Sequence, residues 1–145
     1  VGWKDLDFII VDMPPGTGDT QLTFSQEIKM DGAIIISTPQ EVALLDVKRG
    51  IKMFDKLGVK ILGLVDNMSY FTGDDGKKYK IFGEGGVKRT AEEFGKEFLG
   101  EIPLNPEVGK CGDEGKPIVE ANPDHEISKI YLNFANKIKS IYLKS

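Results

Sequence analysis

Residues 12–19 read Asp-Met-Pro-Pro-Gly-Thr-Gly-Asp, which places an acid, two prolines and two glycines in one short stretch. A carboxylate such as that of Asp12, at the end of a strand, suits Mg²⁺ bound directly or through water beside nucleotide phosphates. The prolines restrict the backbone, whereas Gly16 and Gly18 let it pass close to a phosphate or move when one leaves. The stretch therefore predicts a phosphate-responsive loop, although an acid at a strand end is also common in ordinary turns.

Four short apolar runs are predicted to be the strands that position this chemistry. The run before Asp12 is too short for a helix and rich in β-branched residues, as expected of a strand buried on both faces of a parallel sheet. Ligands of open α/β sheets gather at the carboxyl ends of the strands, so polar residues there are candidates. The predicted strands are Phe8–Val11, Ala33–Ile36, Ile61–Val65 and Phe98–Ile102.

Helices are predicted between these strands, which indicates a doubly wound, mostly parallel α/β sheet. Helical spacing of apolar residues marks four of them, over residues 20–28, 41–57, 86–94 and 124–143. In the first, we expect Asp19 or Thr20 as the cap, and Leu22, Phe24 and Ile28 in the core. Residues 72–80 are predicted to form a hairpin or mobile loop, residues 103–106 a rigid loop, and residues 115–123 a linker.

The Asp-Met-Pro-Pro-Gly-Thr-Gly-Asp string resembles the switch II signature of the Mrp/ApbC family of P-loop ATPases, relatives of the MinD/ParA group that carry iron–sulfur clusters. Further stretches resemble that family in the same order, at residues 32–46, 67–71, 81–86 and 98–104. The resemblance covers the chain up to about Val119. It implies a partial SIMIBI-type P-loop NTPase fold that uses ATP and Mg²⁺.

The resemblance also implies roles for individual residues. Asp12 would hold Mg²⁺, directly or through water, and Asn67 would recognise adenine, for which its amide has matching donors and acceptors. Without the resemblance, an Asn that makes a local turn is the simpler interpretation of Asn67. Asp46 or Lys48 would lie near the nucleotide and a subunit contact. Residues expected to sense the γ-phosphate are Gly16, Thr17, Gly18 and Asp19, and those expected beside the nucleotide are Pro39, Pro103 and Leu104.

Two parts of the family pattern are missing from this sequence. No Gly-rich phosphate loop with its lysine occurs, so we expect residues 1–145 to be the C-terminal portion of a single P-loop ATPase domain. Many members carry Cys-x-x-Cys where this chain has residues 72–80, and two subunits then supply four thiolates to a 4Fe–4S cluster. That absence argues against a cluster on this chain. Cys111 is interpreted as a bystander thiol and His125 as incidental.

Composition indicates an ordinary globular protein with a net charge of −4 and no basic stripe, so nucleic acid is not expected as a partner. No apolar run approaches the length of a membrane span, and the single cysteine agrees with a reducing compartment. We therefore expect a cytoplasmic protein without a membrane partner. The resemblance implies a homodimer whose partners are iron–sulfur apo-proteins or assembly factors.

Three functions follow from these observations. The leading one is an ATP-binding and ATP-hydrolysing iron–sulfur cluster carrier. The first alternative is a MinD/ParA-like positioning ATPase, which shares the fold and the nucleotide chemistry. The second is a non-catalytic fragment or scaffold that dimerises without turnover, and the missing phosphate loop favours it for this chain alone.

Overall fold

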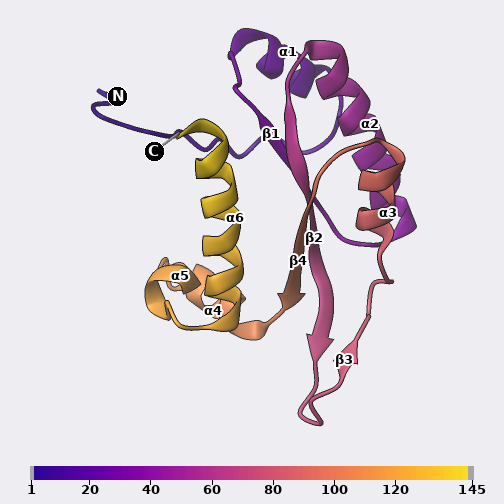
Figure 1. Ribbon diagram of the computed structural model, residues 1–145, viewed down its shortest axis with the longest axis vertical. Coiled ribbons are helices and arrows are strands. Elements are labelled where there is room, and N and C mark those ends of the chain that lie inside the picture. The colour runs from indigo at the N-terminus through magenta and orange to yellow at the C-terminus, as the bar shows by residue number, and fades with distance from the viewer. Residues whose placement is uncertain (1, 144–145) are drawn as a thin grey trace.

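The computed structural model describes residues 2–143, which form a sheet between two layers of helices (Figure 1). The predicted doubly wound α/β architecture is confirmed. Residues 1, 144 and 145 of the predicted domain lie outside the described residues. The parallel strands are β1 (Ala33–Ser37), β2 (Ile61–Thr72) and β4 (Phe98–Leu104), with β2 in the middle, and β3 (Lys78–Tyr79) pairs antiparallel with the end of β2.

One core lies between the sheet and the pair of helices α2 (Glu41–Leu57) and α3 (Gly86–Glu93). The predicted apolar stripe of α2 is buried here, and Gly58 ends the helix in the left-handed region, at φ 70°. A left-handed residue of this kind is a common helix end, and glycine adopts it without a steric penalty. The buried residues are Leu44, Val47, Ile51, Phe54, Val59, Ile61, Leu64, Val87 and Ala91.

A second core fills the opposite face of the sheet, under α4 (Pro106–Asp113), α5 (Ile118–Ala121) and α6 (Glu126–Tyr142). The sequence predicted only the last of these helices. The predicted linker at residues 115–123 contains α5, and α4 follows the predicted loop. Pro106, predicted to belong to a rigid loop, instead occupies the first turn of α4, where its missing N–H costs nothing, and Asn105 caps that turn.

The predicted strand Phe8–Val11 is wrong for the described chain, because these residues belong to no strand. Ile9, Ile10 and Val11 are 57%, 84% and 44% exposed. A strand needs a neighbour that supplies ladder hydrogen bonds, and none of the described strands lies in register with this segment. The set of four strands therefore differs from the predicted set, with β3 in place of Phe8–Val11.

Helix α1 (Asp19–Glu27) confirms the first predicted helix but not its details. Gly18, and neither Asp19 nor Thr20, is the N-cap residue, and it makes no side-chain cap. Leu22 and Phe24 are only half-buried, and Ile28 is 40% exposed. The reason is that α1 packs mainly against α2, at one side of the described chain.

The two ends of the described chain lie close together beside the end of α6 (Figure 1). The Tyr142 hydroxyl donates to the Asp31 carbonyl, and the Tyr142 ring meets the Phe8 ring edge-on at 6.2 Å between centroids. The predicted stripe of α6 is buried at Ile127, whereas Tyr131 and Ile141 on it remain exposed. No helix within residues 2–143 has the length and apolarity needed to cross a membrane.

Candidate functional site

Asn67 lies at a bulge in the ladder between β2 and β4. Asn67 is in register with Ile102, but the next pair joins Phe71 to Leu104, so β2 contains extra residues between these points. Met68, at φ 53°, is in the left-handed region that non-glycine residues seldom adopt. Bulges of this kind occur next to active sites, where they redirect a side chain. This bulge begins directly after Asn67, at the carboxyl end of the sheet.

Pro103 and Leu104 are the last residues of β4 rather than part of a loop, which corrects the sequence prediction. Pro103 has no N–H to donate, and its position beside the bulge of β2 needs none. Because Asn67 is in register with Ile102, Pro103 follows one residue beyond the partner of Asn67. Asn67 and Pro103 therefore lie on adjacent strands, one residue apart in register.

Pro39 is buried where the chain turns from β1 into α2. The loop 80–86 covers it so closely that a Cβ on Gly86 would lie 2.7 Å from the Pro39 carbonyl oxygen, and one on Gly83 would lie 3.5 Å from it. The Thr38 hydroxyl donates to the side-chain oxygen of Gln40 at 2.9 Å, which orders the same turn. The position of the Pro39 turn is therefore coupled to that of the loop above it.

The predicted phosphate-responsive loop, residues 12–19, meets β1 and α2 around a cavity of about 450 Å³. Gly16, at φ 95°, and Thr17 line it together with Ser37 and Thr38 from the end of β1 and Asp46 from α2. The Gln21 side-chain amide donates to the Pro14 carbonyl and ties the loop to α1. Sequence reasoning missed Gln21, Ser37 and Thr38, although hydroxyls at the end of a parallel strand were a signal that could have found the last two.

Asp12, Gly18 and Asp19 are exposed and are not among the residues that line this cavity. The carboxylate of Asp12 and the hydroxyl of Thr17 are hard oxygen donors, which fits Mg²⁺ better than a softer metal. Of the other two candidates, Asp46 pairs with Arg49 at 3.0 Å and Lys48 with Glu93 at 2.8 Å.

Asp66 is a buried acid at this edge that sequence reasoning did not select. Its side chain is 1% exposed, and neither carboxylate oxygen accepts a hydrogen bond from the described residues. Burial and, to a smaller extent, the nearby Glu101 carboxylate raise the pKa of Asp66, the Lys80 ammonium lowers it, and the net result is a pKa of about 6. The only available signal was an acid within an otherwise apolar strand.

The described residues do not fit an iron–sulfur cluster. Cys111 is 6% exposed and belongs to the core under α4, α5 and α6. The hairpin at residues 72–80 offers aspartates, which are hard ligands unsuited to iron–sulfur chemistry. Within residues 2–143, no group of three or more His, Cys, Asp or Glu side chains is arranged to hold a metal ion.

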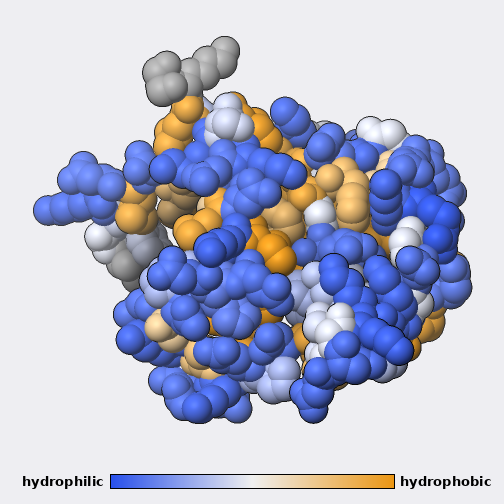
Figure 2. All heavy atoms as spheres, turned by 60° about the horizontal axis from the view of Figure 1, so that its bottom comes forward, coloured by the Kyte–Doolittle hydropathy of each residue, from blue (hydrophilic) through white to orange (hydrophobic). Residues whose placement is uncertain are grey.

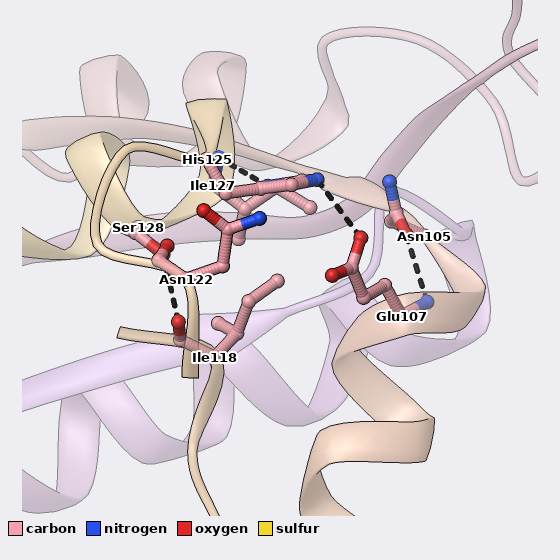
Figure 3. A network of polar contacts seen from close by, with 7 residues as sticks. All are labelled: Asn105, Glu107, Ile118, Asn122, His125, Ile127 and Ser128. Carbon is pink, nitrogen blue, oxygen red and sulfur yellow. Dashed lines mark hydrogen bonds and ion pairs between the residues drawn. The ribbon is translucent and has the colours of Figure 1, made fainter. Parts of the chain in front are cut away.

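His125, interpreted from the sequence as incidental rather than catalytic, has a structural role as a helix cap. Its Nδ1 accepts a hydrogen bond from the Ile127 amide at 3.1 Å and so caps α6 (Figure 3). Its Nε2 lies 3.5 Å from the Glu107 carboxylate, and the Glu107 amide donates to the Asn105 side chain at 2.8 Å. His125 thus links the start of α6 to the turn that follows Pro103 and Leu104.

A family model described as the NUBPL iron-transfer P-loop NTPase of the ParA group matches residues 1–139. The iron–sulfur cluster carrier protein of Aquifex aeolicus is 44% identical over 140 residues, which cover 96% of this chain and 38% of that protein. The chain thus spans well under half the length of this curated relative.

Two solved structures share this fold. A nucleotide-binding protein from Archaeoglobus fulgidus, solved in complex with ADP, is 39% identical with a TM-score of 0.67 over 77% of this chain and 46% of that one. The septum site-determining protein MinD from Pyrococcus horikoshii, complexed with Mg-ADP, has a TM-score of 0.72 at 21% identity, over 93% of this chain and 51% of that one. At that identity, the MinD similarity concerns the fold alone.

Proposed function

Because this chain belongs to the NUBPL iron-transfer family of P-loop NTPases, we propose that it forms the C-terminal portion of one ATPase domain in an iron–sulfur cluster carrier. The 44% identity to a cluster carrier supports this function over that of a positioning ATPase, to which the similarity is in fold only. ATP and Mg²⁺ are the proposed ligands, and the cluster is the proposed cargo.

The observation that carries the proposal is an unfilled position in the sheet. Within the described chain β1 pairs only with β2, and its Ile34 and Ile36 are 40% and 61% exposed. Phe8–Val11, the β-branched run that leads to Asp12, likewise pairs with nothing described. A strand placed between them would satisfy both edges, and the phosphate-loop strand of this family occupies such a position. Its loop would then open at the same edge as Asp12 and the cavity.

At that edge each residue has a separate task. Asp12 would orient the metal-bound nucleotide. Gly16 and Thr17, which line the cavity, would change position when the γ-phosphate binds or leaves. Gln21 holds the start of their loop by its hydrogen bond to the Pro14 carbonyl. Asn67, which stands next to the bulge and one register position from Pro103, would hold the base. Bound Mg²⁺ would neutralise charge on the phosphates. The chain's own contribution would be orientation of the nucleotide.

The cargo would be held by groups other than those described here, since Cys111 is buried in a core. Exposed apolar side chains favour binding of a second copy of the chain or of another protein. An interface would bury these side chains away from water, which is favourable. They lie at the carboxyl end of the sheet, which Figure 2 shows as largely hydrophilic with apolar side chains between the charged ones. They include Ile36 at 61%, Val42 at 73%, Leu45 at 58% and Ile81 at 57% exposure.

The test is a fusion that supplies the missing part. The portion of the Aquifex aeolicus carrier that this chain does not match would be joined to residues 2–145, and ATP hydrolysis and ATP binding would be measured. We expect hydrolysis by the fusion. In Asp12→Asn we expect hydrolysis to fall much more than binding, because the neutral amide keeps the shape but organises Mg²⁺ poorly in the transition state.

The matched control is Asp113→Asn, which removes an exposed carboxylate from the end of α4 and should leave both activities unchanged. A folded fusion that neither binds nor hydrolyses ATP would refute the proposed function. Equal losses of binding and hydrolysis in a folded Asp12→Asn protein would refute the role of Asp12.

A further inference from the structure

Asp66 lies in the middle of the sheet, between residues of both neighbouring parallel strands. Its register partners are Ser37 on β1 and Glu101 on β4. Paired residues on adjacent strands project to the same face, so the Asp66 and Glu101 carboxylates share the face covered by α2 and α3. Two carboxylates on one face, one of them 1% exposed and without a hydrogen bond from the described residues, cannot both ionise freely.

Lys80 is the cation that faces this pair of acids. It comes from the loop between β3 and α3, and its Nζ lies 3.8 Å from Glu101 and 4.0 Å from Glu84. It also lies 5.4 Å from the centre of the Tyr70 ring on β2. Arg89 of α3 donates to the Glu84 carbonyl at 2.9 Å, so α3 is joined to the same loop. Lys80 therefore holds its loop against the sheet beside the Asp66 and Glu101 carboxylates.

The other end of that loop covers the Pro39 turn. A Cβ on Gly86 would lie 2.7 Å from the Pro39 carbonyl oxygen and 2.7 Å from the Leu44 side chain, so no space separates the loop from the turn. A change in the position of Lys80 at the start of the loop would therefore displace the Pro39 turn, which contacts the other end of the loop. Packed elements transmit small displacements in this way because they have no voids to absorb them.

We propose that Asp66 is a positioning residue whose protonation sets how firmly Lys80 holds the loop 80–86 against the Pro39 turn. When Asp66 is protonated, Lys80 balances one nearby carboxylate of the pair. When Asp66 loses its proton, Lys80 faces two carboxylates and is drawn toward the sheet. The link to nucleotide binding rests on the proposed function, which places Pro39 beside the nucleotide. The movement of the loop does not depend on it.

The experiment is an NMR titration of the chain without nucleotide between pH 4.5 and 8. It follows the Asp66 carboxyl carbon and the backbone amides of Gly83, Gly85, Gly86 and Gln40. Burial and Glu101 raise the pKa of Asp66 to about 6, so we expect the carboxyl and these amides to shift with one common midpoint near that pH. The shift of the amides should vanish in Asp66→Asn and persist in the control Asp113→Asn.

Two further variants keep the test decisive if Asp66→Asn does not fold. Glu101→Gln removes a repelling charge and should lower the midpoint of the Asp66 carboxyl, whereas Lys80→Met removes the attracting charge and should raise that midpoint. Lys80→Met should also abolish the shift of the loop amides, because the loop then has no cation to respond to Asp66. Loop amides that stay still while Asp66 titrates, or that still shift in Asp66→Asn, would overturn the proposal. Midpoints that move in the same direction in the two variants would also overturn it. Because no nucleotide is present, a failure to bind ATP leaves this result unaffected.

Discussion

Gly86 lies directly against Pro39, and a Cβ at position 86 would lie 2.7 Å from the Pro39 carbonyl oxygen and 2.7 Å from a Leu44 methyl carbon. Real Cβ contacts of that length require a neighbour to move. One neighbour is backbone and the other is a core side chain that is 4% exposed. The close approach of α3 to the start of α2 therefore depends on the absence of a side chain at this position.

Gly86→Ala should destabilise the protein by roughly 1–3 kcal/mol, the usual cost of forcing an extra carbon into a packed core. Urea unfolding would measure it. Gly109→Ala is the matched control, because Gly109 lies in helix α4 and a Cβ there would meet nothing within 4 Å. Alanine should stabilise that helix by up to about 1 kcal/mol. Equal effects at both positions would contradict the close packing of Gly86.

The pH dependence of stability should carry the signature of Asp66. The pKa of Asp66 is raised to about 6 in the folded state. The folded state is therefore stabilised by protonated Asp66 below the ordinary carboxyl pKa, and this stabilisation is lost as pH rises through 6. The free energy of unfolding of the wild type, relative to Asp66→Asn, should therefore fall between pH 4 and 8 by up to roughly 3 kcal/mol. A difference that is flat across this range, measured by urea unfolding, would contradict the burial of an ionisable Asp66.

Much of the fold was predictable because its signals are local. The stripe Leu44, Val47, Ile51 and Phe54 repeats at helical spacing, and a glycine follows where the helix ends. The hairpin after β2 was equally local. The prediction of a strand at Phe8–Val11 was wrong because a strand needs a neighbouring strand to pair with, and local composition does not show whether that neighbour is present. The prediction that Pro103 lies in a loop was wrong because the bulge at Met68 interrupts the hydrogen-bond ladder and so allows a proline within β4.

The candidate site was predictable only in part, for a related reason. The string around Gly16 and Thr17 predicts a phosphate-responsive loop, but no motif points to Gln21, which donates to the Pro14 carbonyl, or to Asp66, which is buried in the sheet. The structural role of His125 depends on two contacts, the hydrogen bond from the nearby Ile127 amide and the contact with Glu107, which is distant in sequence. Contacts of this kind follow from packing and have no motif.

His125→Ala should destabilise α6 by about 1 kcal/mol, because the Ile127 amide loses its acceptor. The companion variant His125→Asn keeps a side-chain acceptor at the N-cap and loses only the contact with Glu107. It should therefore recover most of that stability in thermal or urea unfolding. A full loss of stability in His125→Asn would show that the Glu107 contact, and not the cap, is what matters.

Anaerobic reconstitution of this chain with iron and sulfide should give no stable, stoichiometric cluster. Cys111 is buried in the core, and one thiolate is too few for a 4Fe–4S cluster even in a dimer. The measurement is the visible absorption that remains after desalting. A band that survives desalting and disappears in Cys111→Ser would contradict this prediction.

The most direct test of the central claim, that this chain completes a nucleotide site but cannot form one alone, is calorimetry with ATP and Mg²⁺ on the isolated chain. Phosphate affinity in P-loop proteins rests on backbone amides and a lysine that this sequence lacks. One adenine hydrogen bond at Asn67 contributes roughly 0.5–1.5 kcal/mol, too little to offset immobilising a ligand. We predict no binding tighter than about millimolar, or about 4 kcal/mol. Micromolar binding by the isolated chain that is abolished by Asn67→Ala would contradict the account.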